Sequence, residues 1–435
     1  MANQCNKVKR NGLLAITPML FLVVMFVLFG FLMGAFSKIP LLIVFFLTSI
    51  YAMWTLRGMT VQERLSVFSK GAGNETLLLM VWIFLLAGGF VETAKLTGAV
   101  DSMVNLTLSF LPSNLLLPGI FFASCFVSIS IGSAFGTVVA LAPIGVGLCQ
   151  STGIPIGLLA GAVVGGSFFG DNLSFISDTT IVATRLQGCP MRDKFRANIR
   201  FALPAALITA AIYYFLGGDQ TQQPEVGSYN LLLVLPYLVV LILAIVGIDV
   251  MLVLVIGIAC TCMTGLITGN CSLVSWIVAL AEGMKSMGEI TFIAMMAGGI
   301  LNVISRGGGL VWIMRGITKR VNGVRGAELS IVTLVAITCA CTAYNTIAIL
   351  SVGHLSKNIA DRYGITPRRT ASLLDTGACC VQGLLPYGAH LLVASTISGI
   401  SSLELVKYEF YPLILLVCLL TTILLSKRKT NGKEG

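Results

Sequence analysis

The sequence predicts an all-α polytopic membrane protein made of two inverted-topology repeats of five spans, each with a re-entrant hairpin and a broken helix. Hydrophobic residues make up 56% of the 435-residue chain and charged residues only 11%, whereas soluble domains carry roughly 25% charged residues. Mean hydropathy is +0.94, and apolar runs of about 20 residues, long enough to cross a bilayer, recur along the chain. Their order in residues 1–222 recurs in residues 223–435, the two predicted domains.

The first repeat begins with a basic segment and a long apolar run. This run is too long for a signal peptide and lacks a small-residue cleavage site, so we interpret it as the first span. The uncharged stretch 115–150 is interrupted at Gly132 and Ser133, and forms either a re-entrant helical hairpin or two short spans. Segment 98–112 is mixed in character and is expected at the membrane interface. The expected spans are 12–36, 39–56, 76–97, 153–186 and 201–217.

The second repeat follows the same order, with an uncharged stretch at 329–353 between its third and fourth spans. Four short matches fall in nearly one register, at an offset of about 209 to 211 positions. They are "AGGFVETAKLTGA" from Ala87 with "AGGILNVISRGGG" from Ala297, "SAFGTVV" from Ser133 with "TAYNTIA" from Thr342, Gly153-Ile154 with Gly364-Ile365, and "LSFISDTTIVAT" from Leu173 with "LLPYGAHLLVAS" from Leu384. The expected spans are 228–247, 249–268, 288–305, 371–399 and 403–425.

Charge predicts the orientation in the membrane. Five spans are an odd number, so the second repeat is inverted relative to the first. With a cytoplasmic N-terminus, every basic cluster falls on the cytoplasmic side, as the positive-inside rule requires: 57–75, 185–200, 306–325, 354–370 and Lys427–Lys429. The opposite face receives 217–228, without Lys or Arg, and 398–409, with one. The protein is therefore expected in the cytoplasmic membrane, with both termini in the cytoplasm.

The fourth span of the first repeat concentrates polar groups. A carboxylate at mid-membrane costs roughly 2.5–3.5 kcal/mol, and helices break there only where protein or water satisfies the freed backbone groups. Asp171 and Asp178 are seven residues apart, so on an unbroken helix they would share one face. Hard cations prefer oxygen ligands, and a carboxylate binds either Na⁺ or a proton. The expected ion-binding residues are Asp171, Asn172, Ser174, Ser177, Asp178, Thr179 and Thr180.

An alternative is that Asp178 caps a cytoplasmic helix end and Asp171 pairs with Arg185 or Arg192. The hairpin tips would approach the binding centre from opposite sides, although their hydroxyls could instead bond within a helix; the tip residues are Ser133, Thr137, Thr342, Asn345 and Thr346. Further proton-binding or second-repeat candidates are Glu92, Asp375 and His390. Glu92 could instead pair with Lys95, and His390 could be a hydrogen-bonded structural residue.

Several function classes lack support. The cysteines lie mostly in apolar runs without ligand spacing, which indicates small buried hydrophobes. We find no Walker A motif, nucleophile elbow or metal-ligand spacing, so no enzyme, cofactor or metal other than a transported Na⁺ is expected. The net charge of +10 lies in the loop clusters, which argues against a nucleic-acid partner.

Three motifs resemble the NhaC-type sodium/proton antiporters, a branch of the ion transporter superfamily. They are "FFGDNLSFISDTT" (168–180), "GSAFGT" (132–137) and "RLQGCPMRDKF" (185–195). The resemblance covers nearly the whole chain. It implies substrate binding where hairpin tips and helix breaks meet, with ions at Asp171, Asn172, Ser174, Ser177, Asp178 and Thr179 and with Thr137 nearby. Relatives often have proline where this chain has Phe175, and Pro386 holds the corresponding place in the second repeat.

The leading hypothesis is secondary active Na⁺/H⁺ exchange by alternating access, with Asp171 and Asp178 shared between Na⁺ and protons. The alternative is a Na⁺- or H⁺-coupled carrier of a small organic acid or amino acid, because some family members carry such solutes. It would use the same cation site and second-repeat groups around Asn345 and Pro386–Ala389. A passive channel would leave Asp171 unexplained. Expected partners are Na⁺, H⁺, the lipid bilayer and, in the alternative, an organic solute; a homodimer is left open.

Overall fold

The structure, a computed structural model, is all-helical over the residues it describes, which are 2–33, 40–110, 112, 115–174, 177–217, 227–246, 248–318 and 323–425. Among these, eight helices are long and apolar enough to cross a membrane, or nine if the bent pair at 389–398 and 402–408 counts as one span. The prediction of an all-α polytopic membrane protein is confirmed. Phe175, most of the 217–228 loop and Lys427–Lys429 lie outside the described residues.

The first half of the chain folds into α1 (Ala2–Leu32), α2 (Leu41–Thr55), α3 (Val61–Ala72), α4 (Glu75–Thr97), α5 (Ala99–Phe110), α6 (Leu116–Ile131), α7 (Ala134–Thr152), α8 (Ile156–Leu173), α9 (Asp178–Gln187) and α10 (Met191–Gly217). The second half folds into α11 (Leu231–Ile245), α12 (Val250–Thr268), α13 (Leu273–Ser286), α14 (Gly288–Arg306), α15 (Gly309–Thr318), α16 (Gly323–Thr342), α17 (Asn345–Tyr363), α18 (Pro367–Gln382), α19 (Ala389–Ser398), α20 (Ser402–Leu405), the 3₁₀ helix η3 (Val406–Tyr408) and α21 (Phe410–Leu425).

Each expected span contains a helix or a pair of helices, and three differences stand out. α3 and α13 were not expected as helices. α3 is amphipathic and begins with a capping box in which Thr60 and Glu63 bond reciprocally. The prediction that 185–200 is a connecting segment is wrong in part, because α10 already begins at Met191.

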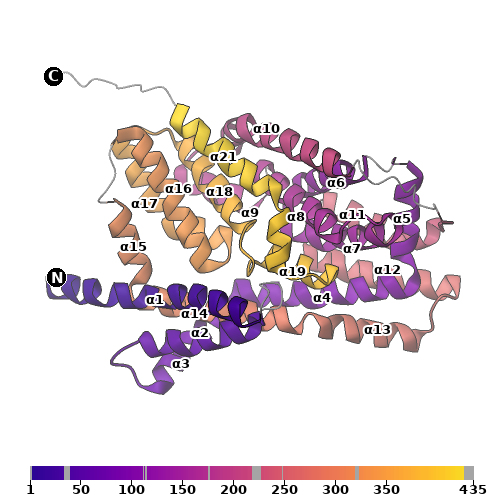
Figure 1. Cartoon of the computed structure of the whole chain (residues 1–435), viewed down its shortest axis with the longest axis horizontal. Coiled ribbons are helices and arrows are strands. Elements are labelled where there is room, and N and C mark those ends of the chain that lie inside the picture. Colours follow the sequence, from indigo (N-terminus) through magenta and orange to yellow (C-terminus); the bar gives the residue numbers. More distant parts are fainter. Residues whose placement is uncertain are drawn as a thin grey trace.

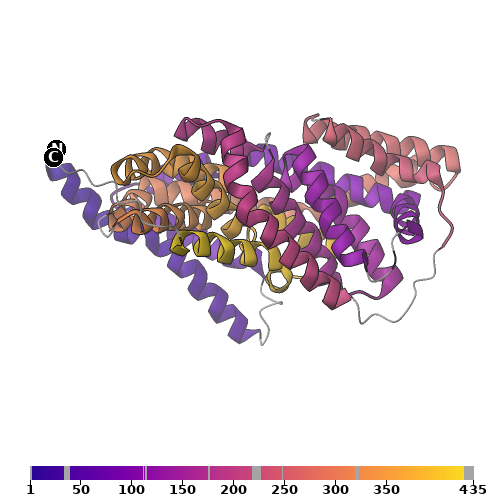
Figure 2. The ribbon, with the colours of Figure 1, turned by 90° about the horizontal axis from the view of Figure 1, so that it is seen from above.

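The helices form two groups. A peripheral group contains α1–α4 and α12–α14, in which α3 packs on α14 and α13 packs on α4. A central group contains α6–α10 and α16–α21, in which α6 packs on α8 and α16 on α17 and α18. Figure 1 shows α1, α4 and α13 in the lower half of the molecule, with α2 and α3 below α1 and the central group above them. Seen from above, α1 lies at the end of the long axis opposite α12 and α13 (Figure 2).

The span formed by α8 and α9 occupies the centre of the bundle. Within an 18-residue apolar window of this span 94% of the residues are buried, against 22% for the first span. Small residues let α6 and α8 approach closely: Ser128 Oγ donates to the carbonyl of Ser167 at 2.6 Å, and a Cβ added to Gly170 would lie 2.2 Å from Ser128 Cβ. This contact fixes the end of α8, where Asp171 lies.

Two further helix breaks separate α6 from α7 and α16 from α17. The chain passes through the left-handed region at Gly132 (φ 71°) in the first break and at Ala343 (φ 53°) in the second. Glycine adopts this conformation without strain, whereas alanine does so at a cost. α7 begins at Ala134 and α17 at Asn345, so the two helix starts are 211 positions apart. The motif match of Ser133 with Thr342 has an offset of 209 positions, which is two positions too short.

Gly170→Ala is expected to destabilise the protein. The added methyl would meet Ser128 Cβ at 2.2 Å and the backbone nitrogen of Ile129 at 2.5 Å, so α6 and α8 must separate. The cost should be about 1–3 kcal/mol, measured as a lower unfolding temperature in detergent. The control is Gly326→Ala in α16, where nothing lies within 4 Å of the new Cβ; equal melting of both variants would contradict the role of the contact.

Candidate functional site

The polar stretch of the first half is a helix break. α8 ends at Leu173 and α9 begins at Asp178, so Asp171 lies in the last turn of one helix and Asp178 starts the next. The two carboxylates therefore do not lie on one face of a continuous helix. The two carboxylates instead line one cavity because the break turns both helix ends toward it.

Asp171 is held by neutral donors from both halves of the chain. Its Oδ1 accepts from Ser177 Oγ at 2.7 Å, and the Ser177 and Thr179 hydroxyls are 2.7 Å apart. Its Oδ2 accepts from Asn345 Nδ2 at 3.0 Å. Among the described ion pairs, none joins Asp171 to Arg185 or Arg192, so that alternative is wrong. The bond to Asn345 ties the break in α8–α9 to the start of α17.

A cavity of about 550 Å³ opens at this point, lined by the interrupted segments of both halves. Its lining includes Asp171, Asp178 and Thr179 at the first break, and His390 at the start of α19. A third carboxylate, Asp249, comes from the loop before α12; the sequence analysis did not single it out. No Lys or Arg lines the cavity among the described residues, so its polar lining suits a cation.

Three of the five predicted tip residues line the cavity: Ser133, Asn345 and Thr346. Ser133 also caps α7, because its hydroxyl accepts from the backbone of Gly136 at 3.1 Å. The other two hydroxyls act within the backbone, as the alternative interpretation proposed. Thr137 Oγ1 donates to the carbonyl of Ser133 at 2.9 Å, and Thr342 Oγ1 donates to that of Tyr344 at 2.9 Å. Thr137 and Thr342 therefore stabilise the backbone at the two breaks and do not line the cavity.

Three predicted ion-binding residues lie behind the cavity wall. Ser174 Oγ donates to the carbonyl of Ile129 at 2.9 Å and ties the break to α6. Asn172 is buried, and its main-chain carbonyl accepts from Lys194 Nζ at 2.7 Å. Thr180 Oγ1 accepts from the same ammonium at 2.6 Å. The structure therefore brings Asp171, Ser177, Asp178 and Thr179 together and assigns the others to a second layer.

Lys194 belongs to the basic segment 185–200, but it is buried, unlike the arginines of that segment, which are exposed. Its side chain is 1% exposed, and Nζ lies 2.6 Å from Asp375 Oδ2 in a fully buried ion pair. Asn198 Nδ2 donates to Asp375 Oδ2 at 3.1 Å and to the carbonyl of Asn172 at 3.0 Å. Asp375, a predicted second-repeat group, is thus neutralised by a lysine of the first half, and the pair joins α10 and α18 to the end of α8.

A helical spacing in the sequence could have revealed Lys194. Lys194 and Asn198 are one turn apart, and the same face continues through Ala202 and Ala205, which are also buried. The arginines of this segment, Arg192, Arg196 and Arg200, share another face and are exposed. Reading the basic run as a loop hid this division.

The remaining candidates divide. His390 lines the cavity, with its ring 4.7 Å from that of Phe168 and its Nδ1 3.5 Å from Gln382 Nε2. Glu92 does not line it. Its carboxylate pairs with Lys95 at 2.7 Å on a partly exposed face of α4, as the alternative interpretation stated.

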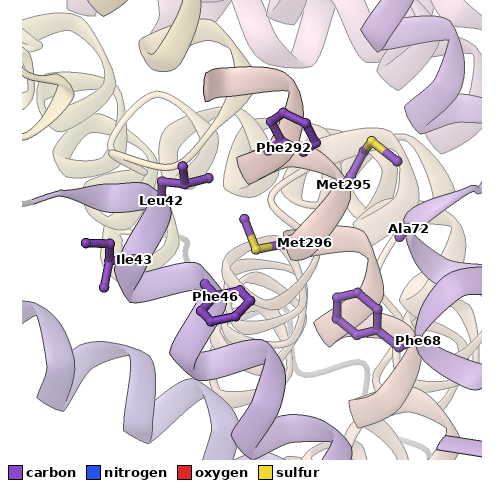
Figure 3. Close-up of a pocket in the computed structure, with 8 residues that line it drawn as sticks. All are labelled: Leu42, Ile43, Phe46, Phe68, Ala72, Phe292, Met295 and Met296. Carbon is purple, nitrogen blue, oxygen red and sulfur yellow. The ribbon is translucent and has the colours of Figure 1, made fainter. Parts of the chain in front are cut away.

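A second cavity, of about 520 Å³, lies between α2, α3 and α14 (Figure 3). Its described lining is entirely apolar: Leu42, Ile43, Phe46, Phe68, Ala72, Phe292, Met295 and Met296. It offers a cation no side-chain oxygen ligand, so it is not a candidate ion site.

Known proteins resemble the whole chain. A sequence model described as the Na⁺/H⁺ antiporter family matches residues 10–218 and 225–427, the family that the three motifs indicated. The chain is 26% identical to the Na(+)/H(+) antiporter NhaC of Bacillus subtilis (strain 168), over 92% of this chain and 94% of that protein. It is 22% identical to the malate-2H(+)/Na(+)-lactate antiporter of the same strain, over 77% and 78%. It is 25% identical to the arginine/ornithine antiporter ArcD of Halobacterium salinarum, over 87% and 84%.

Lys194→Met is expected to destabilise the protein because it leaves Asp375 buried without its cation. Breaking a buried pair in this way costs about 3–5 kcal/mol, measured as a fall in unfolding temperature. Adding Asp375→Asn should recover much of the loss, because both charges are then gone. The control is Arg192→Met on the exposed face of α10, and a Lys194→Met variant as stable as that control would contradict the pairing.

Proposed function

Because this chain belongs to the Na⁺/H⁺ antiporter family, we propose that it is a secondary active transporter that exchanges Na⁺ for H⁺ across the cytoplasmic membrane. The family contains both ion exchangers and carriers of organic solutes, so the exchanged ions are the proposal. One observation carries it: Asp171 and Asp178 face a single cavity at a helix break in the most buried span.

The geometry supports competition between Na⁺ and protons at Asp171. Each carboxylate oxygen has two lone pairs. The bonds from Ser177 and Asn345 use one on each oxygen, and the Cys379 thiol also donates to Oδ2 at 3.7 Å. Oδ1 therefore keeps capacity for a cation or a proton. Asp178 and Thr179 add oxygens on the same cavity. Because Na⁺ and H⁺ exclude one another at this carboxylate, release of one on either side of the membrane requires uptake of the other.

The pairing of Lys194 with Asp375 leaves Asp171 as the buried aspartate that is available to bind Na⁺ or a proton. It already compensates Asp375 at 2.6 Å, whereas the hydrogen-bond partners of Asp171 are neutral. A buried carboxylate without a cationic partner is costly, so Asp171 is the group that gains most from binding Na⁺ or a proton. Asp375 keeps its own counter-charge throughout.

We also propose that residues 1–222 and 223–435 are inverted repeats of five spans. Positive-φ positions support this, since they recur about 210 to 211 residues apart: Gly58 with Gly269, Gly98 with Gly308, Gly132 with Ala343, Gly153 with Gly364, and Gly188 with Gly399. Packing recurs too. The bond from Ser128 Oγ to the Ser167 carbonyl has its counterpart in the contact of Cys339 Sγ with the Ala378 carbonyl.

Alternating access then follows from movement of the central group against the peripheral group, with the cavity at their boundary. Lining residues come from both groups, for instance Met80 of α4 and Phe135 of α7. The odd number of spans per repeat and the positive-inside pattern support a cytoplasmic location of the N- and C-termini.

Asp171→Asn is expected to abolish exchange while leaving the protein folded, because the amide keeps the shape but cannot hold Na⁺ or a transferable proton. The measurement is the collapse of an imposed pH gradient by added Na⁺ in proteoliposomes, with a loss of about 100-fold or more. The matched control is Asp101→Asn in α5, whose side chain is exposed. The proposal fails if saturating Na⁺ moves no protons through the wild-type protein.

The cavity favours one form of the alternative function. Its volume of about 550 Å³ is in the range of small-molecule sites and far exceeds a bare ion. Three aspartates line it, with no Lys or Arg among the described lining residues. An amino acid with a cationic side chain therefore fits better than a di- or monocarboxylate. One relative is named an arginine/ornithine antiporter.

Counterflow of labelled arginine and of labelled malate into proteoliposomes tests this alternative. If the cavity takes a cationic amino acid, arginine exchanges and malate does not. Asp249→Asn then weakens arginine uptake by about tenfold, the cost of one lost charge-assisted contact. Malate uptake without arginine uptake would rule out the cationic solute.

A further inference from the structure

Glu409 is a buried carboxyl outside the cavity. It lies at the bend between η3 and α21, and its side chain is 0% exposed. Neither of its carboxylate oxygens has a hydrogen-bond partner among the described residues, and it belongs to none of the ion pairs found there. The mechanism described above does not use it.

The elements packed around Glu409 supply no positive charge. α8 presents Gly165, where an added Cβ would lie 3.8 Å from Glu409 Oε2. α10 presents Tyr213, whose hydroxyl donates to the carbonyl of Tyr408 at 3.0 Å. α21 presents Tyr411, which is fully buried. α6 also brings the Cys125 thiol close to Tyr213. The titratable groups around Glu409 on these elements are thus tyrosines and a thiol, and none of them is a cation.

The charged residues on its own segment point elsewhere. Lys407 is exposed and Glu404 is partly exposed, while Glu409 is enclosed. An ionised carboxylate without a partner is strongly disfavoured in an apolar interior. In this conformation Glu409 therefore holds its proton and is neutral. It would ionise only if a movement at the bend admitted water to it.

The position of Glu409 in the second half is that of Asn198 in the first, about 211 residues earlier. Asn198 contacts Asp375. The residue that corresponds to Asp375 in the first half is Val164, which precedes Gly165. The counterpart of Lys194 is Leu405. The site equivalent to the buried ion pair therefore has neither the lysine nor the aspartate, and Glu409 is the carboxyl that it contains.

We propose that Glu409 is a second proton-binding residue of the transport cycle, separate from the cavity aspartates. This rests on the proposed Na⁺/H⁺ exchange. When a conformational change admits water, the O–H bond of Glu409 breaks and the proton passes to water on one side. The carboxylate takes a proton from water on the other side before it is buried again. α8 lies beside Glu409 at Gly165 and carries Asp171 in its last turn, so one helix movement reaches both groups.

The test is the number of protons exchanged per Na⁺, measured in proteoliposomes as the pH gradient that balances a set Na⁺ gradient at known membrane potential. Glu409→Gln mimics the protonated carboxyl and should keep the fold. Its expected effect is a loss of one proton per Na⁺, so that the response to membrane potential changes by one elementary charge, while the Na⁺-induced rise in unfolding temperature is kept. Glu404→Gln on the same segment is the control.

The outcomes separate the two proposals. If the wild-type protein exchanges ions and Glu409→Gln keeps the same stoichiometry and pH profile, the role of Glu409 is overturned and Na⁺/H⁺ exchange stands. If the wild-type protein shows no exchange, the proposed function itself fails. If Glu409→Gln does not fold, infrared difference spectra of wild-type protein and of the triple variant Asp171→Asn, Asp178→Asn, Asp249→Asn decide, because the variant lacks every cavity aspartate. A buried carboxylic-acid band that changes with pH and persists in the triple variant supports Glu409, and its absence overturns the proposal.

Discussion

The buried ion pair between Lys194 and Asp375 is the interaction on which the arrangement of the site depends. It joins α10 to α18, and the same ammonium bonds to the carbonyl of Asn172 at the end of α8. Inside a bilayer a charge must be paired, since no water solvates it. By satisfying Asp375, the lysine leaves Asp171 as the carboxylate with only neutral partners, which is the property an exchange site needs.

The two halves share their backbone geometry but differ in the side chains at matching positions. The breaks, the positive-φ positions and the close helix contacts recur about 211 positions apart, so both halves supply interrupted helices to the centre. The side chains at matching positions differ: Gln382 stands for Asp171, Ala389 for Asp178 and Leu405 for Lys194. The first half thus contributes Asp171 and Asp178 to the cavity lining, and the second contributes Asp249, Asn345 and His390. In the proposed mechanism the similar backbones permit two access states, while the different side chains leave one cavity for the ion.

Helix breaks explain why polar groups collect where they do. At each break the backbone loses intrahelical bonds, and hydroxyls such as Thr137, Thr342 and Ser174 restore them. These residues shape the site without facing it. The residues that face the cavity, Asp171, Asp178 and Asn345, lie at helix ends, where their oxygens and amide groups are free for a ligand. Proximity to the motif alone does not separate the two roles.

The sequence by itself determined the membrane class, the spans and the aspartates of the central break, because hydropathy and a charge inside an apolar run are local properties. It also indicated the family, through motifs at 132–137, 168–180 and 185–195. Only the tertiary structure decided that Lys194 is buried against Asp375, that Asn345 reaches Asp171, and that Asp249 joins the cavity. These contacts join residues far apart in the chain. A periodic pattern along one segment can indicate which face of α10 is buried, but which residues cover that face depends on how α8 and α18 pack against it.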